Sequence, residues 1–341
     1  MKIVSIDDSE GTVLCHDITE IVPGKFKGRA FKKGHVITKE DIPKLLNLGK
    51  EHLYVWDINN GFLHEDDAAL RLAKAAGGNG LRLSGPSEGK VELVSEYPGL
   101  LKINVNLLDL VNDIDQVVLS TIHNNQMVPA GCRVAGCRVV PIVIETAKIE
   151  KAEQLCGEYH PLIEVKPLKY HKVGVITTGS EVYHGRIKDQ FGPVIKKKFS
   201  DMGSEVVRQI FVPDSIELFT DAVKSLLDDG VDLIAATGGM SVDPDDLTPA
   251  GIRAAGGRVV IYGAPVLPGS MFMLAYIDHV PVMGLPGCVM YNKNTVFDLV
   301  APRILAGEDV QRRDILKLAH GGMCEGCKVC HFPNCSFGKG S

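Results

Sequence analysis

Residues 237–249 read Thr237-Gly238-Gly239-Met240-Ser241-Val242-Asp243-Pro244-Asp245-Asp246-Leu247-Thr248-Pro249. An apolar run at 231–236 precedes this stretch and predicts a buried strand, and a short helical pattern follows from Pro249 to Ala255. A glycine pair directly after a strand lets the backbone approach a ligand closely, because no side chain stands in the way. Thr248 suits the N-cap of the helix, and Pro249 suits its first position.

Three carboxylates, Asp243, Asp245 and Asp246, crowd the same turn. The N–H groups at the start of the following helix favour an anion. Carboxylates beside an anion site make physical sense mainly when a hard cation such as Mg²⁺ lies between them. The alternative is an acidic, solvent-exposed loop whose aspartates cap and turn the chain. The residues of this stretch alone leave both interpretations open.

Two further glycine-bearing loops also follow predicted strands. Thr177-Thr178-Gly179-Ser180-Glu181 comes after an apolar run at 173–176. Gly284-Leu285-Pro286-Gly287-Cys288 comes after a run at 281–283 and before a helical pattern at 292–305. Three such loops after three strands indicate a shared purpose more strongly than any one of them alone.

The same part of the chain alternates strand and helix patterns. A strand pattern at 206–212 precedes an apolar helix face made by Phe219, Ala222, Val223, Leu226 and Leu227. This β-α-β alternation with short loops predicts a parallel sheet with helices on both faces. Ligands of such sheets bind beyond the carboxyl ends of the strands, where the three loops lie.

The totals limit the classes of function. The chain has 341 residues, of which 45% are hydrophobic, so we expect two or three domains. A net charge of −5 argues against non-specific nucleic-acid binding as the main activity. No apolar run reaches the roughly 20 residues of a membrane span. The first eight residues are too polar for a signal peptide, and we therefore expect a cytoplasmic protein.

Changes in sequence pattern predict four segments. They are a β-rich module at 1–60, an α+β domain at 61–170, an α/β domain at 171–310 and a cysteine-rich tail at 320–341. Within the second segment, an alanine-rich helix is expected at 66–76. Strand patterns at 91–94 and 100–105, separated by Pro98-Gly99, predict a hairpin there.

With the three loops in view, residues about 172–307 resemble the molybdopterin-binding domain. That domain is shared by molybdopterin molybdotransferases, molybdopterin adenylyltransferases, gephyrin and the competence-damage-inducible proteins. The additional N-terminal part and the Leu-Pro-Gly loop make the chain similar to the molybdotransferase branch. The matching residues are Thr177–Val182, Asp189, Pro213-Asp214, Thr237–Val242, Asp246, Thr248-Pro249, Pro268-Gly269 and Leu285-Pro286-Gly287.

The resemblance implies a role in assembly of the molybdenum cofactor. The family substrate is adenylylated molybdopterin, into which molybdate is inserted with loss of the adenylate. Asp246, Glu181 and Asp189 would be the catalytic residues, with Asp246 and Glu181 holding Mg²⁺. A homodimer and a recipient molybdoenzyme are the implied protein partners. The implied molybdopterin-binding residues are Thr178, Gly179, Ser180, Gly238, Gly239, Ser241, Pro286 and Gly287.

Each acidic residue also has a structural interpretation. Glu181 could only cap the turn that follows it, and Asp246 could only support the helix start at Thr248. Asp189 could be a plain helix N-cap. The sequence alone does not choose between these roles and catalysis.

Several residues depart from the family pattern. Ser180 stands where the molybdotransferases usually carry Asp, and Phe191 where they usually show Asn. Leu267 and Ser270 flank Pro268-Gly269 in a loop that is usually basic. Cys288-Val289 replaces the usual Asn-Pro, and residues 1–170 contain no match to the family's Asp-Gly-Tyr-Ala segment. Molybdopterin binding is therefore better supported than molybdate insertion. The first hypothesis from the resemblance is a molybdotransferase-like enzyme that inserts molybdate. A non-catalytic molybdopterin-binding or carrier protein and a nucleotide pyrophosphatase of the competence-damage type are the alternatives.

Four of the nine cysteines lie in the tail, at positions 324, 327, 330 and 335. The spacing Cys-x2-Cys-x2-Cys-x4-Cys predicts that Cys324, Cys327, Cys330 and Cys335 share a metal in a reducing compartment. The x2 spacings resemble iron–sulfur ligation, although the last gap and the absence of proline after Cys335 differ from the ferredoxin run. Zinc held by four cysteines, or with His331 replacing one of them, is the alternative. The other five cysteines are expected to be free thiols.

Overall fold

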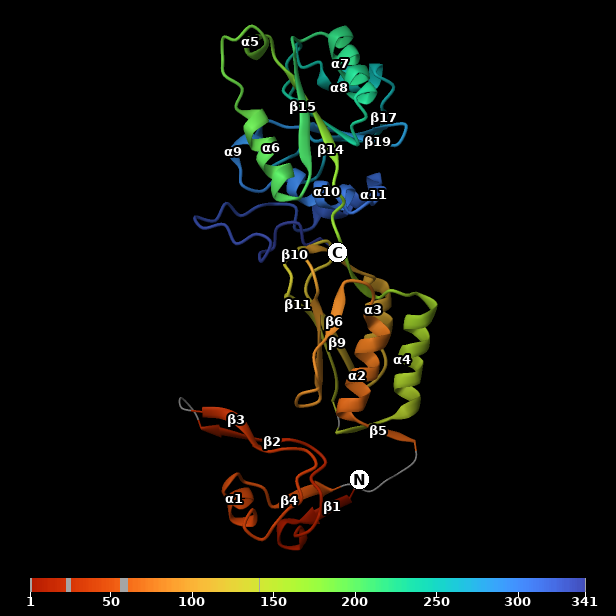
Figure 1. Cartoon of the computed structure of the whole chain (residues 1–341), viewed down its shortest axis with the longest axis vertical. Coiled ribbons are helices and arrows are strands. Elements are labelled where there is room, and N and C mark those ends of the chain that lie inside the picture. Colours follow the sequence, from red (N-terminus) through yellow and green to blue (C-terminus); the bar gives the residue numbers. More distant parts are fainter. Residues whose placement is uncertain (1, 23–25, 56–60, 141, 341) are drawn as a thin grey trace. The chain divides into compact units, whose positions relative to one another are not determined.

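The computed structural model describes residues 2–22, 26–55, 61–140 and 142–340 (Figure 1). The chain divides into two compact units. Unit 1 comprises Met1–Tyr97, Lys102–Ile122 and Pro129–Val165, and unit 2 comprises Pro98–Leu101, His123–Val128 and Lys166–Ser341. The predicted segment boundary at residue 60 lies outside the described residues.

The N-terminal part of unit 1 is built from two antiparallel strand pairs, β1 with β4 and β2 with β3. A small apolar core holds it together, with Leu14, Leu45 and Leu53 each at most 2% exposed. The elements are β1 (Lys2–Ser5), a 3-10 turn (Ile6–Asp8), β2 (Ile18–Val22), β3 (Phe26–Phe31), α1 (Ile42–Asn47) and β4 (His52–Val55).

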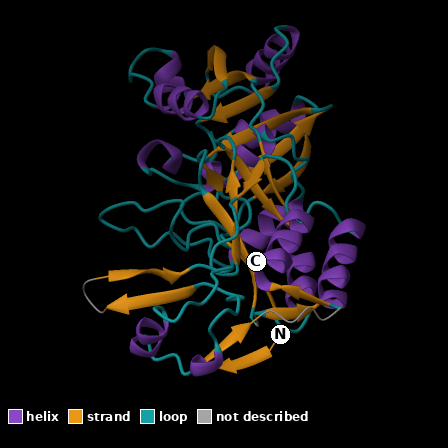
Figure 2. Ribbon diagram, turned by 60° about the horizontal axis from the view of Figure 1, so that its bottom comes forward, coloured by secondary structure: helices purple, strands orange, loops and turns teal. Residues whose placement is uncertain are grey.

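The rest of unit 1 is a four-stranded antiparallel sheet in the order β6-β7-β11-β9, and α2, α3 and α4 pack beside it (Figure 1). Figure 2 shows these helices in purple and the strands in orange. A separate pair, β5 with β12, leads into α2 and α4. The elements are β5 (Phe62–His64), α2 (Glu65–Ala76), β6 (Leu81–Leu83), β7 (Lys90–Ser95), α3 (Val105–Asn112), β9 (Val117–Thr121), β11 (Arg133–Val139), β12 (Val143–Glu145) and α4 (Thr146–Glu158).

The predicted hairpin at 91–105 is wrong. Strand β7 pairs with β6 and β11, whereas β8 (Gly99–Ile103) pairs with β10 (Met127–Val128). Glu96, between the two strands, donates its N–H to the Gly80 carbonyl, so the chain leaves β7 toward other partners. Turn residues mark where a strand ends but do not fix which strand it pairs with, because distant partners compete. A further short strand, β13 (Ile163–Lys166), ends this part of the chain.

Unit 2 contains a six-stranded sheet in the order β15-β14-β16-β19-β18-β17. Strands β15, β14, β16 and β19 are parallel, as expected. The prediction of a wholly parallel sheet is wrong, because β18 and β17 run antiparallel. Only Asp278 and His279 separate β18 from β19, and a two-residue turn can join only antiparallel strands. The strands are β14 (Lys172–Thr178), β15 (Glu205–Val212), β16 (Leu233–Thr237), β17 (Arg258–Tyr262), β18 (Met273–Ile277) and β19 (Val280–Leu285).

Helices cover both faces of this sheet, giving the expected three layers (Figure 1). On one face, Phe199 of α6 and Phe297 of α10 meet edge to face, with ring centroids 5.3 Å apart. On the other face, Phe219 of α7 and Ile252 of α8 are buried against the strands. The helices are α5 (Ser180–Tyr183), α6 (Phe191–Asp201), α7 (Ile216–Asp228), α8 (Thr248–Ala254), α9 (Cys288–Tyr291), α10 (Val296–Leu305) and α11 (Arg312–Leu316), followed by a 3-10 turn (Lys317–Ala319).

The helix predicted at 292–305 begins four residues late. Asn292 has an extended backbone and ends α9, and Thr295 starts α10 through a capping box with Asp298. Asp298 accepts the Thr295 backbone N–H, a reciprocal bond that fixes the start of the helix. Among the described residues, none of the helices combines the length and apolarity needed to cross a bilayer.

Candidate functional site

The three glycine-bearing loops leave one edge of the unit 2 sheet. Strands β14, β16 and β19 are parallel neighbours, with Thr177 opposite Thr237 and Thr237 opposite Leu285. Parallel strands in this register end at the same edge, so the loops carrying Gly179, Gly238 and Gly287 begin side by side. The arrangement expected from the sequence is therefore present in the fold.

The first two loops are bonded to one another. The Thr248 hydroxyl donates to the Gly238 carbonyl at 2.8 Å and lies 3.1 Å from the Thr178 hydroxyl. A Cβ atom at Gly238 would lie 2.2 Å from the Thr178 carbonyl oxygen, and the φ of Gly238 is +83°. Only glycine combines this conformation with so close an approach. Thr178 and Thr248 are both buried and act here as links between the loops.

A cleft of about 490 Å³ opens beside these loops. Six of the predicted site residues line it: Gly238, Gly239, Ser241, Asp246, Pro286 and Gly287. The rest of its described lining comes from Phe191, Met240, Leu267, Pro268, Gly269, Ser270, Met271 and Cys288. The wall is therefore mostly apolar or backbone, as small-molecule sites usually are.

Asp246 is the one charged residue among the described residues that line the cleft. One of its carboxylate oxygens, Oδ2, accepts the Asp243 backbone N–H at 2.9 Å, and its own N–H donates to the Asp243 carbonyl at 3.0 Å. These bonds hold the loop so that Asp246 borders the cleft. The side chains of Asp243 and Asp245 are exposed and do not border it. Of the three neighbouring carboxylates expected from the sequence, that of Asp246 borders the cleft and those of Asp243 and Asp245 do not.

The loop after β14 lies outside the described lining of the cleft. Ser180 donates both its backbone N–H and its hydroxyl to Asp214 Oδ2, each at 3.0 Å. The Glu181 carboxylate folds back over Gly179, where an added Cβ would lie 2.9 Å from Oε1. Thr178 therefore contacts Gly238 of the cleft wall, whereas Gly179, Ser180 and Glu181 are not among the described residues that line the cleft.

Asp189 occupies the start of α6. Its Oδ1 accepts the backbone N–H of Phe191 at 2.9 Å, and its Oδ2 accepts from Gln209 at 2.8 Å. It also accepts the Gly192 N–H. These are the contacts of a helix cap. Through them Asp189 positions Phe191, which lines the cleft.

Cys288 lines the cleft at the start of α9. Burial raises the pKa of its thiol above the ordinary value. The thiol is therefore protonated at neutral pH, and a nucleophilic thiolate is not favoured there.

The four tail cysteines line a second cavity in unit 2, of about 520 Å³. Within the described part of the chain, no three His, Cys, Asp or Glu side chains are grouped as ligands of a single metal ion. Cys324, Cys327, Cys330 and Cys335 therefore line one cavity, but they are not arranged as ligands around a single metal position.

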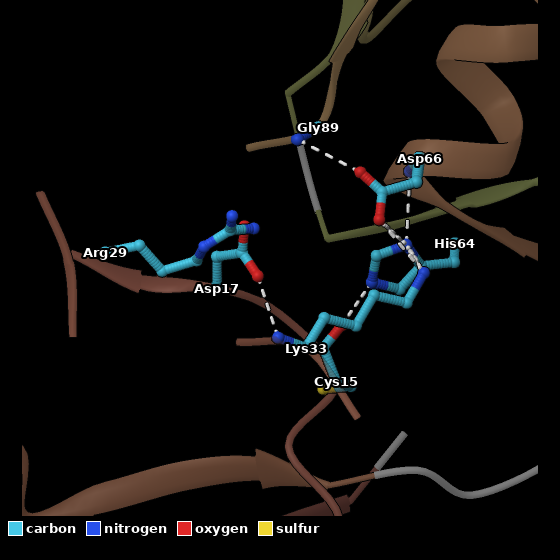
Figure 3. Close-up of polar contacts among 7 residues, drawn as sticks. All are labelled: Cys15, Asp17, Arg29, Lys33, His64, Asp66 and Gly89. Carbon is cyan, nitrogen blue, oxygen red and sulfur yellow. Dashed lines mark hydrogen bonds and ion pairs between the residues drawn. The ribbon is translucent and has the colours of Figure 1, made fainter. Parts of the chain in front are cut away.

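A buried polar cluster in unit 1 was not foreseen from the sequence (Figure 3). His64, 3% exposed, bonds the Cys15 carbonyl through Nε2. Its Nδ1 accepts the Asp66 backbone N–H at 3.1 Å and lies 2.8 Å from Lys33 Nζ. Burial, and then the Lys33 charge, lower the pKa of His64. Neutral imidazole satisfies all these contacts, so the cluster is a structural joint between the β3 and α2 regions.

Comparison with known proteins identifies the domain that carries the cleft. Residues 174–306 match the model of the probable molybdopterin-binding domain. This segment belongs to the molybdopterin-binding domain family. The family predicted from the three glycine loops is thereby confirmed for these residues. Residues 3–57 match a separate model, a domain of unknown function (DUF8806).

The molybdopterin-binding domain has relatives in proteins of different names. Molybdopterin molybdenumtransferase of Staphylococcus aureus (strain COL) is 30% identical over 131 residues, which are 36% of this chain and 31% of the relative. A CinA-like protein of Mycobacterium sp. (strain JLS) is 34% identical over 90 residues, 26% of this chain and 21% of the relative. The chain thus matches less than a third of the length of either relative.

Solved structures similar to this domain include the molybdopterin biosynthesis enzyme MoaB from Thermus thermophilus. It is 20% identical, with a TM-score of 0.33, and the match covers 40% of this chain and 98% of that one. The tungsten cofactor synthesizing protein MoaB from Pyrococcus furiosus is 21% identical, with a TM-score of 0.33 and coverage of 42% and 98%.

Proposed function

We propose that unit 2 binds molybdopterin or its adenylate in the glycine-lined cleft. The observation that carries the proposal is that the loops after β16 and β19 line one cleft inside a molybdopterin-binding domain. Gly238, Gly239 and Gly287 leave the backbone accessible from that cleft. Backbone N–H groups in glycine-rich turns are suited to phosphate oxygens.

The cleft offers different chemistry to the two ends of such a ligand. Phe191, Met240 and Met271 provide aromatic and thioether surface that suits a flat pterin ring. No Lys or Arg occurs among the described lining residues, so the phosphates would depend on backbone amides and on a cation. This lack of basic side chains in the described lining agrees with the sequence, in which Leu267 and Ser270 lie in a loop that is usually basic in the molybdotransferases.

A divalent cation fits this arrangement in a limited way. Magnesium in phosphate sites is usually held by one or two carboxylates together with substrate phosphates and water. Asp246 supplies one carboxylate at the cleft, enough for such a shared site but not for a cage made by the protein alone. When bound, Mg²⁺ would supply charge neutralisation and Lewis acidity. Glu181 remains a second predicted ligand, although its carboxylate lies over Gly179.

Molybdate insertion is the second candidate function, and Asp246 favours it. A cation held at Asp246 would reduce the repulsion between molybdate and the ligand phosphates. Ser180 opposes it, because this residue replaces an expected metal carboxylate and its hydroxyl is bonded to Asp214. Binding without turnover, as a carrier would do, needs only the cleft.

The purified full chain, incubated with adenylylated molybdopterin, molybdate and Mg²⁺, separates these functions. Tight binding without AMP release supports a carrier, and AMP release with formation of active cofactor supports insertion. Hydrolysis of ADP-ribose-like substrates would instead indicate a pyrophosphatase, the activity suggested by the competence-damage resemblance. Absence of binding to molybdopterin and to its adenylate would overturn the proposal.

Two variants assign the role of the carboxylate. Asp246→Asn removes the charge at the cleft and should reduce the Mg²⁺-dependent part of binding or turnover at least about tenfold. Asp245→Asn changes the exposed neighbour in the same loop and should leave both unchanged. Full activity of Asp246→Asn would exclude the cation site at this residue.

A further inference from the structure

The cysteine tail is an integral part of unit 2. Phe337 is 2% exposed and belongs to the core beneath α10. Phe332 packs against the same core, with its ring centroid 6.1 Å from that of Phe337. Earlier in the tail, the Cys324 N–H donates to the Leu267 carbonyl at 2.8 Å, and the Leu267 N–H donates to the Gly322 carbonyl at 2.8 Å. The folded body of the unit therefore anchors the tail at both ends.

Between these anchors, all four tail cysteines line the cavity of about 520 Å³. Cys327 and Cys330 are exposed, and Cys324 and Cys335 are partly exposed. Three cysteines elsewhere in the described residues, Cys15, Cys137 and Cys156, are buried instead. Those three thiols are inert core residues, whereas the tail cysteines are accessible to a metal.

We propose that Cys324, Cys327, Cys330 and Cys335 bind an iron–sulfur cluster in this cavity. Four accessible thiols within twelve residues, at spacings of two, two and four, form a ligand set that a shared metal centre would satisfy. Each thiol loses its proton when it binds the metal. Ferrous and ferric iron together with sulfide supply the oxidation states of the cluster, so no residue of the protein is oxidised or reduced. This inference concerns a site separate from the molybdopterin cleft and does not depend on it.

The spacing of the cysteines favours a cluster over a single zinc ion. Zinc requires its four sulfurs about 2.3 Å from one point. No three potential ligands in the described residues are grouped in that way, yet all four cysteines border one cavity. Cys324, Cys327 and Cys330 follow one another at x2 spacing, as three ligands of bacterial iron–sulfur runs do, and a cluster takes its thiolates on different iron atoms.

The cavity also holds a hydrogen-bond donor to sulfur. Asn294 Nδ2 donates to Cys330 Sγ at 2.9 Å. Donors to the ligating sulfurs are one of the means by which proteins tune cluster potentials. Asn294 lies shortly after α9. Tyr291, the last residue of α9, also lines the cysteine cavity, and Cys288, its first residue, lines the proposed molybdopterin cleft. The short helix α9 therefore runs between the proposed cluster site and the cleft.

Metal analysis of the full chain tests the proposal. The protein is purified without oxygen and incubated with a mixture of ferrous and ferric iron and with sulfide, and then iron, acid-labile sulfide and zinc are measured per chain. We expect iron and sulfide in equal amounts, with visible absorption that dithionite bleaches. One zinc per chain without sulfide, or no stoichiometric metal, would overturn it.

Serine variants assign the ligands. Cys327→Ser and Cys330→Ser change exposed residues that do not belong to the core, so a loss of fold should not obscure the result. Each should lower iron and sulfide content several-fold while the circular dichroism spectrum is retained. Cys132→Ser, at a partly exposed cysteine in unit 1, is the matched control and should leave the content unchanged. Equal iron content in all three variants would refute the assignment.

Discussion

At the scale of single residues, the tightest requirement at the candidate site falls on Gly238. Its backbone lies against the Thr178 carbonyl, and its φ of +83° is one that side-chain-bearing residues rarely adopt. Both facts trace back to the glycine pair in the sequence. The need for glycine was predictable, but the partner was not, because Thr178 is sixty residues earlier in the chain.

Gly238→Ala should destabilise unit 2. Strain in the left-handed region together with a Cβ placed 2.2 Å from an oxygen should cost roughly 1–3 kcal/mol of unfolding free energy or more. Urea denaturation followed by circular dichroism measures the difference. Gly287→Ala is the matched control, because nothing lies within 4 Å of its added Cβ. Equal stability of the two variants would show that the loop contact is not as tight as described.

Burial of His64 makes the stability of unit 1 depend on pH. The folded-state pKa of this histidine is lowered, so the folded state takes up the proton less readily than the unfolded chain does. The full stability is therefore present above the unfolded pKa of about 6.5 and falls as the pH decreases below it.

His64→Gln should flatten this pH dependence. Glutamine keeps an amide group near the position of Nε2 but does not titrate, so the loss of stability between about pH 7 and pH 5 should decrease. Burial also lowers the pKa of His16, so this histidine continues to contribute part of the pH dependence of stability in the variant. His52→Gln changes an exposed histidine and should leave the slope as it is. An unchanged slope in His64→Gln would contradict the role of the buried imidazole.

At the scale of elements, α6 and α10 are joined by a nearly buried ion pair. Lys198 of α6 lies 2.5 Å from Asp298 of α10 and also donates to the Lys293 carbonyl at 2.9 Å. Burial raises the pKa of Asp298, and the ammonium of Lys198 opposes that rise. The same carboxylate completes the capping box of α10, so this one contact supports both a helix start and a helix pairing.

Lys198→Met should cost about 3 kcal/mol at pH 7, because it leaves the Asp298 carboxylate buried without its cation. Without the lysine, the folded pKa of Asp298 rises further above its unfolded value. The deficit should therefore shrink as the pH falls through that raised folded pKa and Asp298 takes up a proton. Denaturation of both proteins at several pH values measures the difference, and a deficit independent of pH would contradict this explanation. Lys197→Met, at an exposed pair with Asp201, should have little effect.

Sequence patterns predicted individual elements better than their partners. The apolar runs of β14, β16 and β19 and the glycines after them were recognisable, because burial on both faces and a sharp end leave a local signature. Strands β17 and β18 were missed, and with them the mixed character of the sheet. Their apolar runs look like those of parallel strands, and the turn at Asp278 lacks the usual glycine.

At the scale of the whole molecule, the sequence predicted which loops would lie side by side. It did not predict which of their residues would line the cleft and which would instead bond to other parts of the domain. Strand order places the loops at one edge, a consequence of parallel topology. Which side chains then face the cleft depends on contacts between distant residues, such as Ser180 with Asp214 and Asp189 with Gln209. The same holds for the tail, where spacing indicated a metal and folding supplied the cavity.

The proposed function of the molecule depends on the glycine-lined cleft holding a molybdopterin ligand. Gly287 allows a direct test, because it lines the cleft, has an ordinary φ of −54° and has open space at its Cβ position. Gly287→Leu should therefore fold normally and fill part of the cleft. Gly157→Leu, at an exposed glycine of α4 with equally open space, is the matched control.

Equilibrium binding of molybdopterin to the wild-type chain and to these two variants is the decisive measurement. Gly287→Leu should weaken binding at least about tenfold, or ~1.4 kcal/mol, while Gly157→Leu should bind like the wild type. Wild-type affinity in a normally folded Gly287→Leu protein would mean that the ligand binds elsewhere, and the cleft would lose its proposed role.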